Sequence, residues 1–317
     1  MNNDQPQIGN DKTLVLLVGP TGVGKTELAL QLAQTLQSPI ISCDSRQVFR
    51  EIPIGTAAPT AEELSRVKHY FIGSRSIEED YSAGEYEREC IPLLQTLFEQ
   101  HDTLLMTGGS MLYADAICNG LDELPHVPEE IRTQVNEHYR TNGIEWLQNQ
   151  VQTLDPDYWK IVDHNNPARL IHCIEICLTT GKTYSSLRTN TKRERPFNIL
   201  KIGLNRPRAE LYERINQRVV EMMNQGLLEE AQKVYAKRHL TSLQTVGYRE
   251  LFDYFSGAYD LDRAIALIQQ NTRHYAKRQL TWFRRDPDIH WLNAQNDYET
   301  NIHTIITLLR TGSVQEK

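Results

Sequence analysis

The chain has 317 residues, of which 39% are hydrophobic and 24% are charged, and its formal net charge is −7. This composition is typical of a water-soluble protein with one large domain and an insertion, or with two modest domains. The acidic net charge argues against a protein coated in basic surface, and no apolar run approaches the roughly 18 residues of a membrane span.

Cysteine usage and the first residues indicate the compartment. Five cysteines are scattered along the chain, which favours reduced thiols over a disulfide framework. Cys173 and Cys177 are four residues apart on a predicted helix, but no further Cys or His nearby completes a four-ligand metal site. The N-terminus lacks the apolar core of a secretory signal. We therefore expect a cytoplasmic protein with no membrane partner.

Strand and helix patterns alternate through the first hundred residues. Thr13–Val18 predicts a buried strand, Lys25–Leu36 a helix, and Ile40–Cys43 a second short strand. Glu85–Gln100 then predicts a helix and Thr103–Thr107 a third strand. Alternation of this kind predicts the α/β class, with a parallel sheet covered by helices on both faces.

The first strand leads into a glycine-rich segment, Gly-Pro-Thr-Gly-Val-Gly-Lys-Thr, which has the P-loop pattern G-x-x-x-x-G-K-T. Its glycines let backbone N–H groups turn toward phosphate oxygens, and the following helix adds its N-terminal dipole. Lys25 supplies charge for the terminal phosphates, and the Thr26 hydroxyl is placed to hold Mg²⁺. The motif predicts a bound di- or triphosphate but not its reaction. The predicted phosphate-binding residues are Gly19, Pro20, Thr21, Gly22, Val23, Gly24, Lys25 and Thr26.

Polar segments also follow the other two predicted strands, at Asp44–Gln47 and Thr107–Ser110. Ligands bind beyond the carboxyl ends of parallel strands, so we expect both segments and the P-loop to converge on one crevice. Asp44 could hold Mg²⁺, act as a general base toward a nucleophile near the phosphate, or simply cap a helix. No Asn-Lys-x-Asp motif occurs, which argues against a GTPase switch.

The pattern changes near residue 120 and becomes helical from Pro128 to about Lys192. Strand character returns at Asn198–Leu204, and a short strand is predicted at Ile289–Leu292. We predict a P-loop NTPase-like parallel sheet core with a helical insertion domain. The core is expected to comprise residues 1–121 and 198–317, and the helical insertion residues 122–197.

Long helices are predicted at Arg208–Lys237 and Leu261–Arg285. Lys and Arg are concentrated in two blocks, residues 182–218 and 273–285, although the chain is acidic overall. This distribution indicates either a localised site for a polyanion or ordinary solvated helix faces.

The ordered set of motifs resembles the tRNA dimethylallyltransferase (isopentenyltransferase) family. Each segment alone is weak, but together they span nearly the whole chain in order. The resemblance implies transfer of a dimethylallyl group from dimethylallyl diphosphate to N6 of adenine 37 in the tRNA anticodon stem-loop. Besides the P-loop, the matching segments are 44–50, 54–59, 107–113, 166–170, 175–182, 246–249 and 277–284.

The resemblance also assigns roles to individual residues. The P-loop and Mg²⁺ would stabilise the charge that develops on the departing diphosphate. Thr21 would lie beside the reacting carbon, and Asp44 would orient the adenine amine and accept its proton. Arg169 would contact the diphosphate from the insertion, although a surface ion pair is the alternative for this residue. His172 stands where the family often has a second arginine.

A base in an anticodon loop must leave its stack before it can be alkylated in a closed pocket. On the predicted helix 261–285, basic residues lie beside Tyr275, Trp282 and Phe283, a combination suited to phosphate contact and stacking. Core packing is the favoured alternative for Trp282. The predicted tRNA-binding residues are Asp44, Ser45, Arg46, Gln47, Thr107, Ser110, Arg169, His172, Arg249, Arg273, Lys277, Arg278 and Arg284.

We expect a monomer whose partners are tRNA and dimethylallyl diphosphate. Three alternatives are a prenyltransferase for free adenine nucleotides, an ATP-dependent small-molecule kinase and a non-catalytic RNA-binding ATPase. The helical insertion and the basic helices favour a macromolecular acceptor over these.

Overall fold

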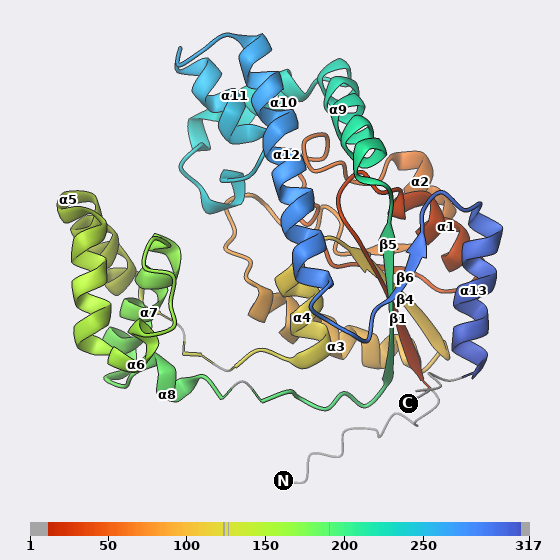
Figure 1. Cartoon of the computed structure of the whole chain (residues 1–317), viewed down its shortest axis with the longest axis horizontal. Helices are drawn as coiled ribbons and strands as arrows, with labels where there is room; N and C mark the ends of the chain where they lie inside the picture. Colours follow the sequence, from red (N-terminus) through yellow and green to blue (C-terminus); the bar gives the residue numbers. More distant parts are fainter. Residues whose placement is uncertain (1–11, 123, 126, 190, 312–317) are drawn as a thin grey trace. The chain divides into compact units, whose positions relative to one another are not determined.

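A computed structural model describes residues 12–122, 124, 125, 127–189 and 191–311 (Figure 1). The chain divides into two compact units. The larger unit contains the residues up to Cys118 and those from Glu194 onward, and the smaller unit is Asn119–Arg193.

The larger unit is built on a six-stranded sheet in which all paired strands are parallel, in the order β3-β2-β4-β1-β5-β6. The prediction of an α/β core with a parallel sheet is therefore confirmed. The strands are β1 (Thr13–Val18), β2 (Ile40–Ser42), β3 (His69–Tyr70), β4 (Thr103–Gly108), β5 (Asn198–Asn205) and β6 (His290–Asn293).

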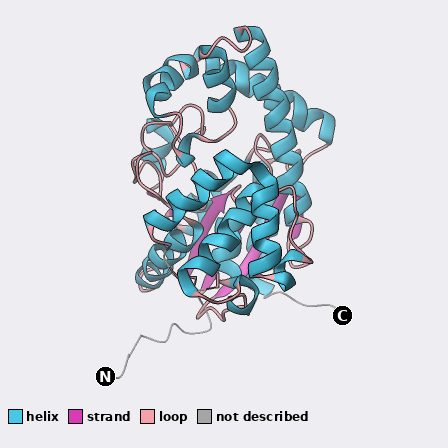
Figure 2. Ribbon diagram, turned by 90° about the vertical axis from the view of Figure 1, so that its left-hand side faces the viewer, coloured by secondary structure: helices cyan, strands magenta, loops and turns pink. Residues whose placement is uncertain are grey.

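Helices cover the sheet, as the side view shows (Figure 2). The predicted helix over 208–237 is wrong in one respect, because Gly226 adopts a φ of 100° and separates α9 from α10. The helices of this unit are α1 (Lys25–Leu36), α2 (Ala61–Arg66), α3 (Ala83–Phe98), α4 (Met111–Asn119), α9 (Arg208–Asn224), α10 (Leu227–Val234), α11 (Tyr248–Phe255), α12 (Leu261–Phe283) and α13 (Tyr298–Thr311), with short 3₁₀ turns at Tyr235–Lys237 and Thr241–Leu243.

Alternate residues of β1 supply two different cores, as expected when side chains of a strand point to opposite faces. Leu14 and Leu16 join a cluster with α3 and α4, whereas Val15 and Leu17 join a cluster with α1, α9 and α13. Because both faces of the sheet are buried, the strand is apolar along its whole length. The ligand-binding loops at its end are thus fixed to a rigid base.

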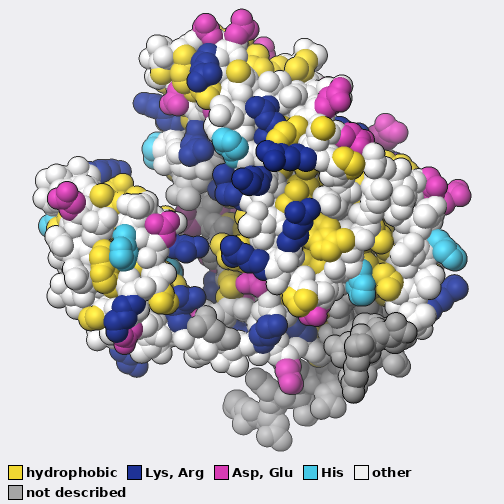
Figure 3. All heavy atoms as spheres, viewed as in Figure 1, with side chains coloured by type: hydrophobic (Ala, Val, Ile, Leu, Met, Phe, Trp, Pro, Cys, Tyr) yellow, Lys and Arg dark blue, Asp and Glu magenta, His cyan; other side chains and the backbone are white. Residues whose placement is uncertain are grey.

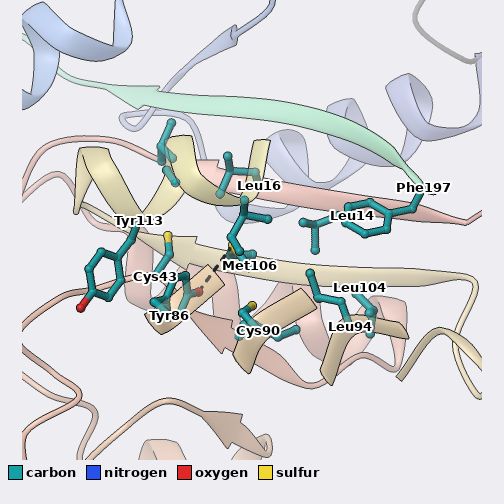
Figure 4. Packing of buried hydrophobic residues seen from close by; sticks show 14 of the residues in the cluster. Leu14, Leu16, Cys43, Tyr86, Cys90, Leu94, Leu104, Met106, Tyr113 and Phe197 are labelled. Carbon is teal, nitrogen blue, oxygen red and sulfur yellow. Dashed lines mark hydrogen bonds between the residues drawn. The ribbon is translucent and has the colours of Figure 1, made fainter. Parts of the chain in front are cut away.

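Figure 4 shows the first of these clusters, in which side chains from β1, β4 and α3 pack together. Tyr86 is fully buried there, and its hydroxyl donates to the carbonyl of Ser42 at 2.9 Å. Its ring stacks on Tyr113, with ring centroids 4.5 Å apart. The buried Tyr86 therefore fixes the end of β2, shortly before Asp44, to the hydrophobic core.

In its described residues, the smaller unit has the helices α5 (Glu129–Leu154), α6 (Pro156–Trp159), α7 (Pro167–Thr180) and α8 (Tyr184–Leu187). Its core forms where α5 packs against α7. Gly143 (φ 71°) kinks α5, and the Asn166 side chain caps α7 by accepting from the Arg169 amide. No strand occurs among the residues described in this unit.

Candidate active site

A cavity of about 770 Å³ lies at the carboxyl ends of β1, β2 and β4. Its lining includes five P-loop residues from the segment after β1, Asp44–Gln47 after β2, and Thr107–Gly109 at the end of β4. The predicted convergence of the three segments is therefore confirmed. The five P-loop residues are Thr21, Gly22, Gly24, Lys25 and Thr26, and the predicted residues Gly19, Pro20 and Val23 lie behind them.

The P-loop needs its glycines for backbone conformation. Gly22 and Gly24 have φ values of 79° and 109°, in the left-handed region that side chains disfavour. Gly24 caps the N-terminus of α1, so backbone N–H groups of the first helical turn face the cavity side of the loop. This arrangement is suited to an anionic oxygen group.

Lys25 lies across the P-loop. Its Nζ donates to the carbonyls of Gly19 at 2.8 Å and Pro20 at 2.9 Å. Burial of the ammonium and the neighbouring charge of Arg218 lower the pKa of Lys25 to about 8, while the charge of Asp44 acts in the opposite direction. The group thus loses its proton more readily than an ordinary lysine, and a bound anion would restore it.

Two arginines of α9 extend the positive charge around the P-loop, and the sequence reasoning assigned neither of them. The Nε of Arg214 donates to the Gly22 carbonyl at 3.0 Å, and Nη1 of Arg218 donates to Oγ1 of Thr21 at 3.4 Å. Both line the cavity, and burial lowers the pKa of Arg218. The two arginines are four residues apart and next to the apolar Ile215. This spacing, which places them on one face of a helix, was the sequence feature that could have predicted them.

Asp44 lines the cavity directly after β2. Its Oδ1 accepts from the backbone N–H groups of Arg46 at 2.9 Å and Gln47 at 3.3 Å, which fixes the turn. Among the described residues, none donates a hydrogen bond to its second oxygen, Oδ2. One oxygen thus orients the carboxylate and the other is available to accept from a ligand.

Arg46 and Gln47 line the cavity, but their side chains are engaged within the protein. The Gln47 amide donates to the carbonyls of Ala57 at 2.9 Å and Thr56 at 3.3 Å, and Nη1 of Arg46 donates to the Ser242 carbonyl at 3.0 Å. Gln47, predicted from the sequence to bind tRNA, therefore fixes the neighbouring loop in this conformation.

Thr107 and Ser110 lie at the end of β4, as predicted, but both bond to other parts of the protein. Oγ1 of Thr107 donates to the Leu17 carbonyl at 3.1 Å. Oγ of Ser110, a buried residue, accepts from the Ser45 amide at 2.8 Å and is 3.0 Å from the Ser45 hydroxyl. Ser45 and Ser110 thus join two of the cavity loops to each other.

Helix α12 has its predicted basic residues on different faces. Arg278 lines the cavity, whereas Lys277 and Arg284 are exposed and do not contribute to its described lining. Arg273 donates to the side-chain oxygen of Asn216 at 2.5 Å and so contacts α9. Figure 3 shows Lys and Arg side chains gathered over this side of the larger unit. Arg249, at the start of α11, also lines the cavity.

Aromatic residues of α12 are also divided between the cavity and the core. Tyr275 lines the cavity, and burial together with the charge of Asp44 raises its pKa to about 12. Phe283 is buried, and Trp282 packs partly against the same core cluster. The favoured interpretation of Trp282 as a core residue is confirmed.

Arg169 and His172 belong to the smaller unit, where both lie on α7. Arg169 is exposed, and its backbone N–H donates to Oδ1 of Asn166 at 3.3 Å. The His172 ring meets Tyr184 edge-on, with centroids 5.4 Å apart, and burial lowers the pKa of His172.

Asp155 joins Cys173 and Cys177 in the smaller unit, with one ligand atom from each residue lying within 4.8 Å of the others. The oxygens of Asp155 already accept from the Tyr158 amide at 2.9 Å and from the amide and hydroxyl of Ser185 at 2.6 and 2.7 Å. The carboxylate therefore acts as the structural link between α6 and α8. The five cysteines are all free thiols.

None of the helices within the described residues combines the length and apolar character needed to cross a bilayer.

The chain is similar to known proteins over most of its length. A family model described as IPP transferase matches residues 47–286. A tRNA dimethylallyltransferase of Bacteroides fragilis is 56% identical over 288 residues, which cover 91% of this chain and 96% of the relative. The structure of a full-length tRNA isopentenylpyrophosphate transferase from Bacillus halodurans matches with a TM-score of 0.70 and 34% identity, covering 95% of this chain and 96% of that one. A eukaryotic dimethylallyltransferase acting on tRNA, 23% identical, has the same fold, with a TM-score of 0.79 over 96% of this chain and 81% of its own.

Proposed function

The chain belongs to the IPP transferase family, and on this premise we propose that it transfers a dimethylallyl group from dimethylallyl diphosphate to N6 of adenine 37 in tRNA. The observation that carries the proposal is the cavity, in which the P-loop and Asp44 lie on neighbouring loops. A diphosphate on one side and a carboxylate on the other provide for a leaving group and for the amine that displaces it.

The P-loop holds the diphosphate through backbone N–H groups, with Lys25, Arg214 and Arg218 around it. As the C–O bond to the dimethylallyl group breaks, negative charge grows on the diphosphate. Cationic groups already placed there stabilise that charge without reorganising, which lowers the barrier. Thr21 contributes its hydroxyl next to Arg218, beside the reacting carbon.

A divalent metal suits this site, because the Thr26 hydroxyl and the diphosphate offer the hard oxygen ligands that Mg²⁺ prefers. Prenyltransferases of this kind typically use such a metal, and we propose Mg²⁺ held by the Thr26 hydroxyl. When bound, it would offset part of the charge on the diphosphate.

Asp44 receives the adenine N6 amine on its second oxygen, Oδ2, while Oδ1 holds the turn. The amine is a weak nucleophile whose lone pair is shared with the ring. A carboxylate that accepts one N6 hydrogen orients the amine toward the carbon, and it takes the proton once the new C–N bond has formed. The base reaches this position only after leaving its stack in the loop.

We further propose that the acceptor is the tRNA anticodon stem-loop and that the enzyme acts as a cytoplasmic monomer. Arg249, Lys277, Arg278 and Arg284 supply positive charge for RNA phosphates. In the insertion, Arg169 is assigned to the diphosphate and His172 to tRNA, on the resemblance alone.

Labelled dimethylallyl diphosphate tests the proposal directly. The purified protein is incubated with the label and Mg²⁺, together with unmodified tRNA, with the same tRNA carrying guanosine at position 37, or with AMP. We expect label on the first acceptor alone. Label on AMP would indicate a nucleotide prenyltransferase, and consumption of ATP without labelling would indicate a kinase or an RNA-binding ATPase. Either result would overturn the proposed function.

A further inference from the structure

Gln279 connects two loops of the cavity through opposite ends of one amide group. Its Oε1 accepts from the backbone N–H of Thr21 at 2.9 Å, and its Nε2 donates to the Gly109 carbonyl at 2.8 Å. The side chain is only 2% exposed. A buried amide whose two ends are both used in this way fixes the separation between its partners.

The two partners belong to different halves of the site. Thr21 is the P-loop residue next to Arg218, and Gly109 follows β4 beside the Asp44 loop. The pairing of β1 with β4 ends at Val18 opposite Gly108, just before the P-loop and Gly109. Beyond the paired strands, the Gln279 amide directly links the phosphate-binding loop to the loop that supports the acceptor side.

One turn earlier on α12, Tyr275 lines the same cavity. It lies beside Ser110, whose Oγ accepts from the Ser45 amide next to Asp44. Residues four apart lie on one face of a helix, so Tyr275 and Gln279 point to the same side of α12. Gln279 thus bonds the loops after β1 and β4 to this helix face, and Ser110 bonds the loop after β2 to the loop after β4.

We propose that Gln279 is a positioning residue for dimethylallyl transfer, one that holds Thr21 of the P-loop in register with Gly109 and the Asp44 loop. It contacts neither substrate and acts through these two backbone groups. The effect on catalysis rests on the proposed function. The structural role of Gln279 rests only on its two hydrogen bonds. Because a misplacement of about 1 Å can cost on the order of 10²-fold in rate, a loosened register should lower turnover much more than binding.

Gly109 offers a second way to break the same contact. A Cβ atom on Gly109 would lie 2.3 Å from Nε2 of Gln279, and the backbone at this position does not have the positive φ that requires glycine. Gly109→Ala therefore displaces the Gln279 side chain without straining its own backbone. Removing that side chain as well should relieve the clash.

The test compares Gln279→Met, which keeps the length of the side chain but loses both hydrogen bonds, with Gln279→Glu, which keeps the acceptor alone. Gln269→Leu is the matched control, because Gln269 lies on the same helix and donates to the Asn216 carbonyl, and neither residue belongs to the described cavity lining. Each variant is measured for kcat and KM with tRNA and dimethylallyl diphosphate. Amide hydrogen exchange of residues 19–24 is measured by mass spectrometry.

We expect kcat of Gln279→Met to fall by about 10- to 100-fold with KM values near wild type, and the P-loop amides to exchange faster. Gln269→Leu should match wild type in both measurements. Gly109→Ala should lower kcat in the same way, and the Gly109→Ala/Gln279→Ala double variant should be no slower than the slower of the two single variants Gly109→Ala and Gln279→Ala. An unchanged kcat, an effect confined to KM, or independent effects of the two positions would overturn the role.

Failure of the proposed function gives a different pattern. In that case wild-type protein leaves the tRNA unlabelled, whereas exchange of the P-loop amides still responds to Gln279→Met. Unchanged exchange in Gln279→Met would overturn the positioning role whatever the reaction is.

Discussion

The guanidinium of Arg218 reaches Thr21 from α9, where its Nη1 donates to the Thr21 hydroxyl at 3.4 Å. The P-loop threonine that resembles a catalytic residue is therefore in contact with a cation that lies 197 positions later in the chain. A P-loop with a second positive group of this kind is suited to holding a leaving diphosphate.

Replacing Arg218 by Gln should lower kcat/KM for dimethylallyl diphosphate by about 10- to 100-fold, because a charge-assisted hydrogen bond contributes about 1.5–3 kcal/mol. Steady-state kinetics at saturating tRNA measures this. Arg208→Gln is the matched control, since Arg208 lies on the same helix but packs over the Tyr212 ring. Equal losses in the two variants would contradict a specific role for Arg218.

Binding of the diphosphate substrate should take up a proton near pH 8. The pKa of Lys25 is about 8 in the ligand-free protein, and a bound anion favours the protonated form, so affinity should fall as pH rises through 8 and above. Calorimetry in buffers of different ionisation enthalpy measures the uptake. In Lys25→Arg the guanidinium keeps its proton, so its weaker affinity should vary less with pH. Because the diphosphate itself titrates in the same way with wild type and with Lys25→Arg, the difference between the two proteins reports on residue 25.

The same shift has a defined effect on stability. Between pH 8 and its ordinary pKa of 10.5, Lys25 is protonated in the unfolded chain but not in the folded one. The unfolded state then binds more protons, so this residue makes the free energy of unfolding rise with pH over that window. Below pH 8 its contribution is constant.

Replacing Asp44 by Ala should lower turnover by at least about 10²-fold, in the range expected for loss of a general base, while tRNA binding is largely retained. Asp44→Asn separates charge from shape, because its side-chain oxygen can still accept from the amides of Arg46 and Gln47. We expect Asn to preserve the loop and yet to lose most of the turnover. Wild-type single-turnover rates in either variant would remove Asp44 from the mechanism.

Glu230 should matter for stability through the loop that borders the cavity. Its buried carboxylate accepts from the amides of Ile54 at 2.9 Å and Gly55 at 2.8 Å and from the Tyr248 hydroxyl at 2.5 Å. Glu230→Ala leaves these donors unpaired and should lower the free energy of unfolding by about 3 kcal/mol in urea titrations. Glu229→Ala, at the exposed neighbouring position, should change it by about 0.5 kcal/mol. Similar losses would contradict the assigned contacts.

The parts of the fold that could be predicted are those with strong local signals. Thr13–Val18 and Lys25–Leu36 have the predicted bounds, because an apolar run and a P-loop define them. β3 consists of His69 and Tyr70 alone, too short to show alternation. Helix α13 was missed although Ile302, Ile305 and Ile306 have helical spacing and pack against the α1 side of the sheet.

The candidate site divides in the same way. The P-loop and Asp44 are found by motifs that the chain places together at strand ends. Arg214 and Arg218 belong to a basic block that, from the sequence, is equally typical of a solvated helix face. Only the packing of α9 against the P-loop shows that they contact Gly22 and Thr21. Gln279 lies in the basic segment that was predicted to bind RNA. Its hydrogen bond with Thr21 depends on the tertiary structure, so the neighbouring sequence does not predict it.

Thr21 and Gln279 are separated by 258 positions, and this distance sets an order of events during synthesis. A ribosome produces the phosphate-binding motif early, but the acceptor for the Thr21 amide exists only after α12 has been translated and has folded. A nascent chain can thus carry a complete G-x-x-x-x-G-K-T segment without a correctly spaced site. The site can therefore become active only after α12, which also carries Lys277 and Arg278, has been synthesised and has folded.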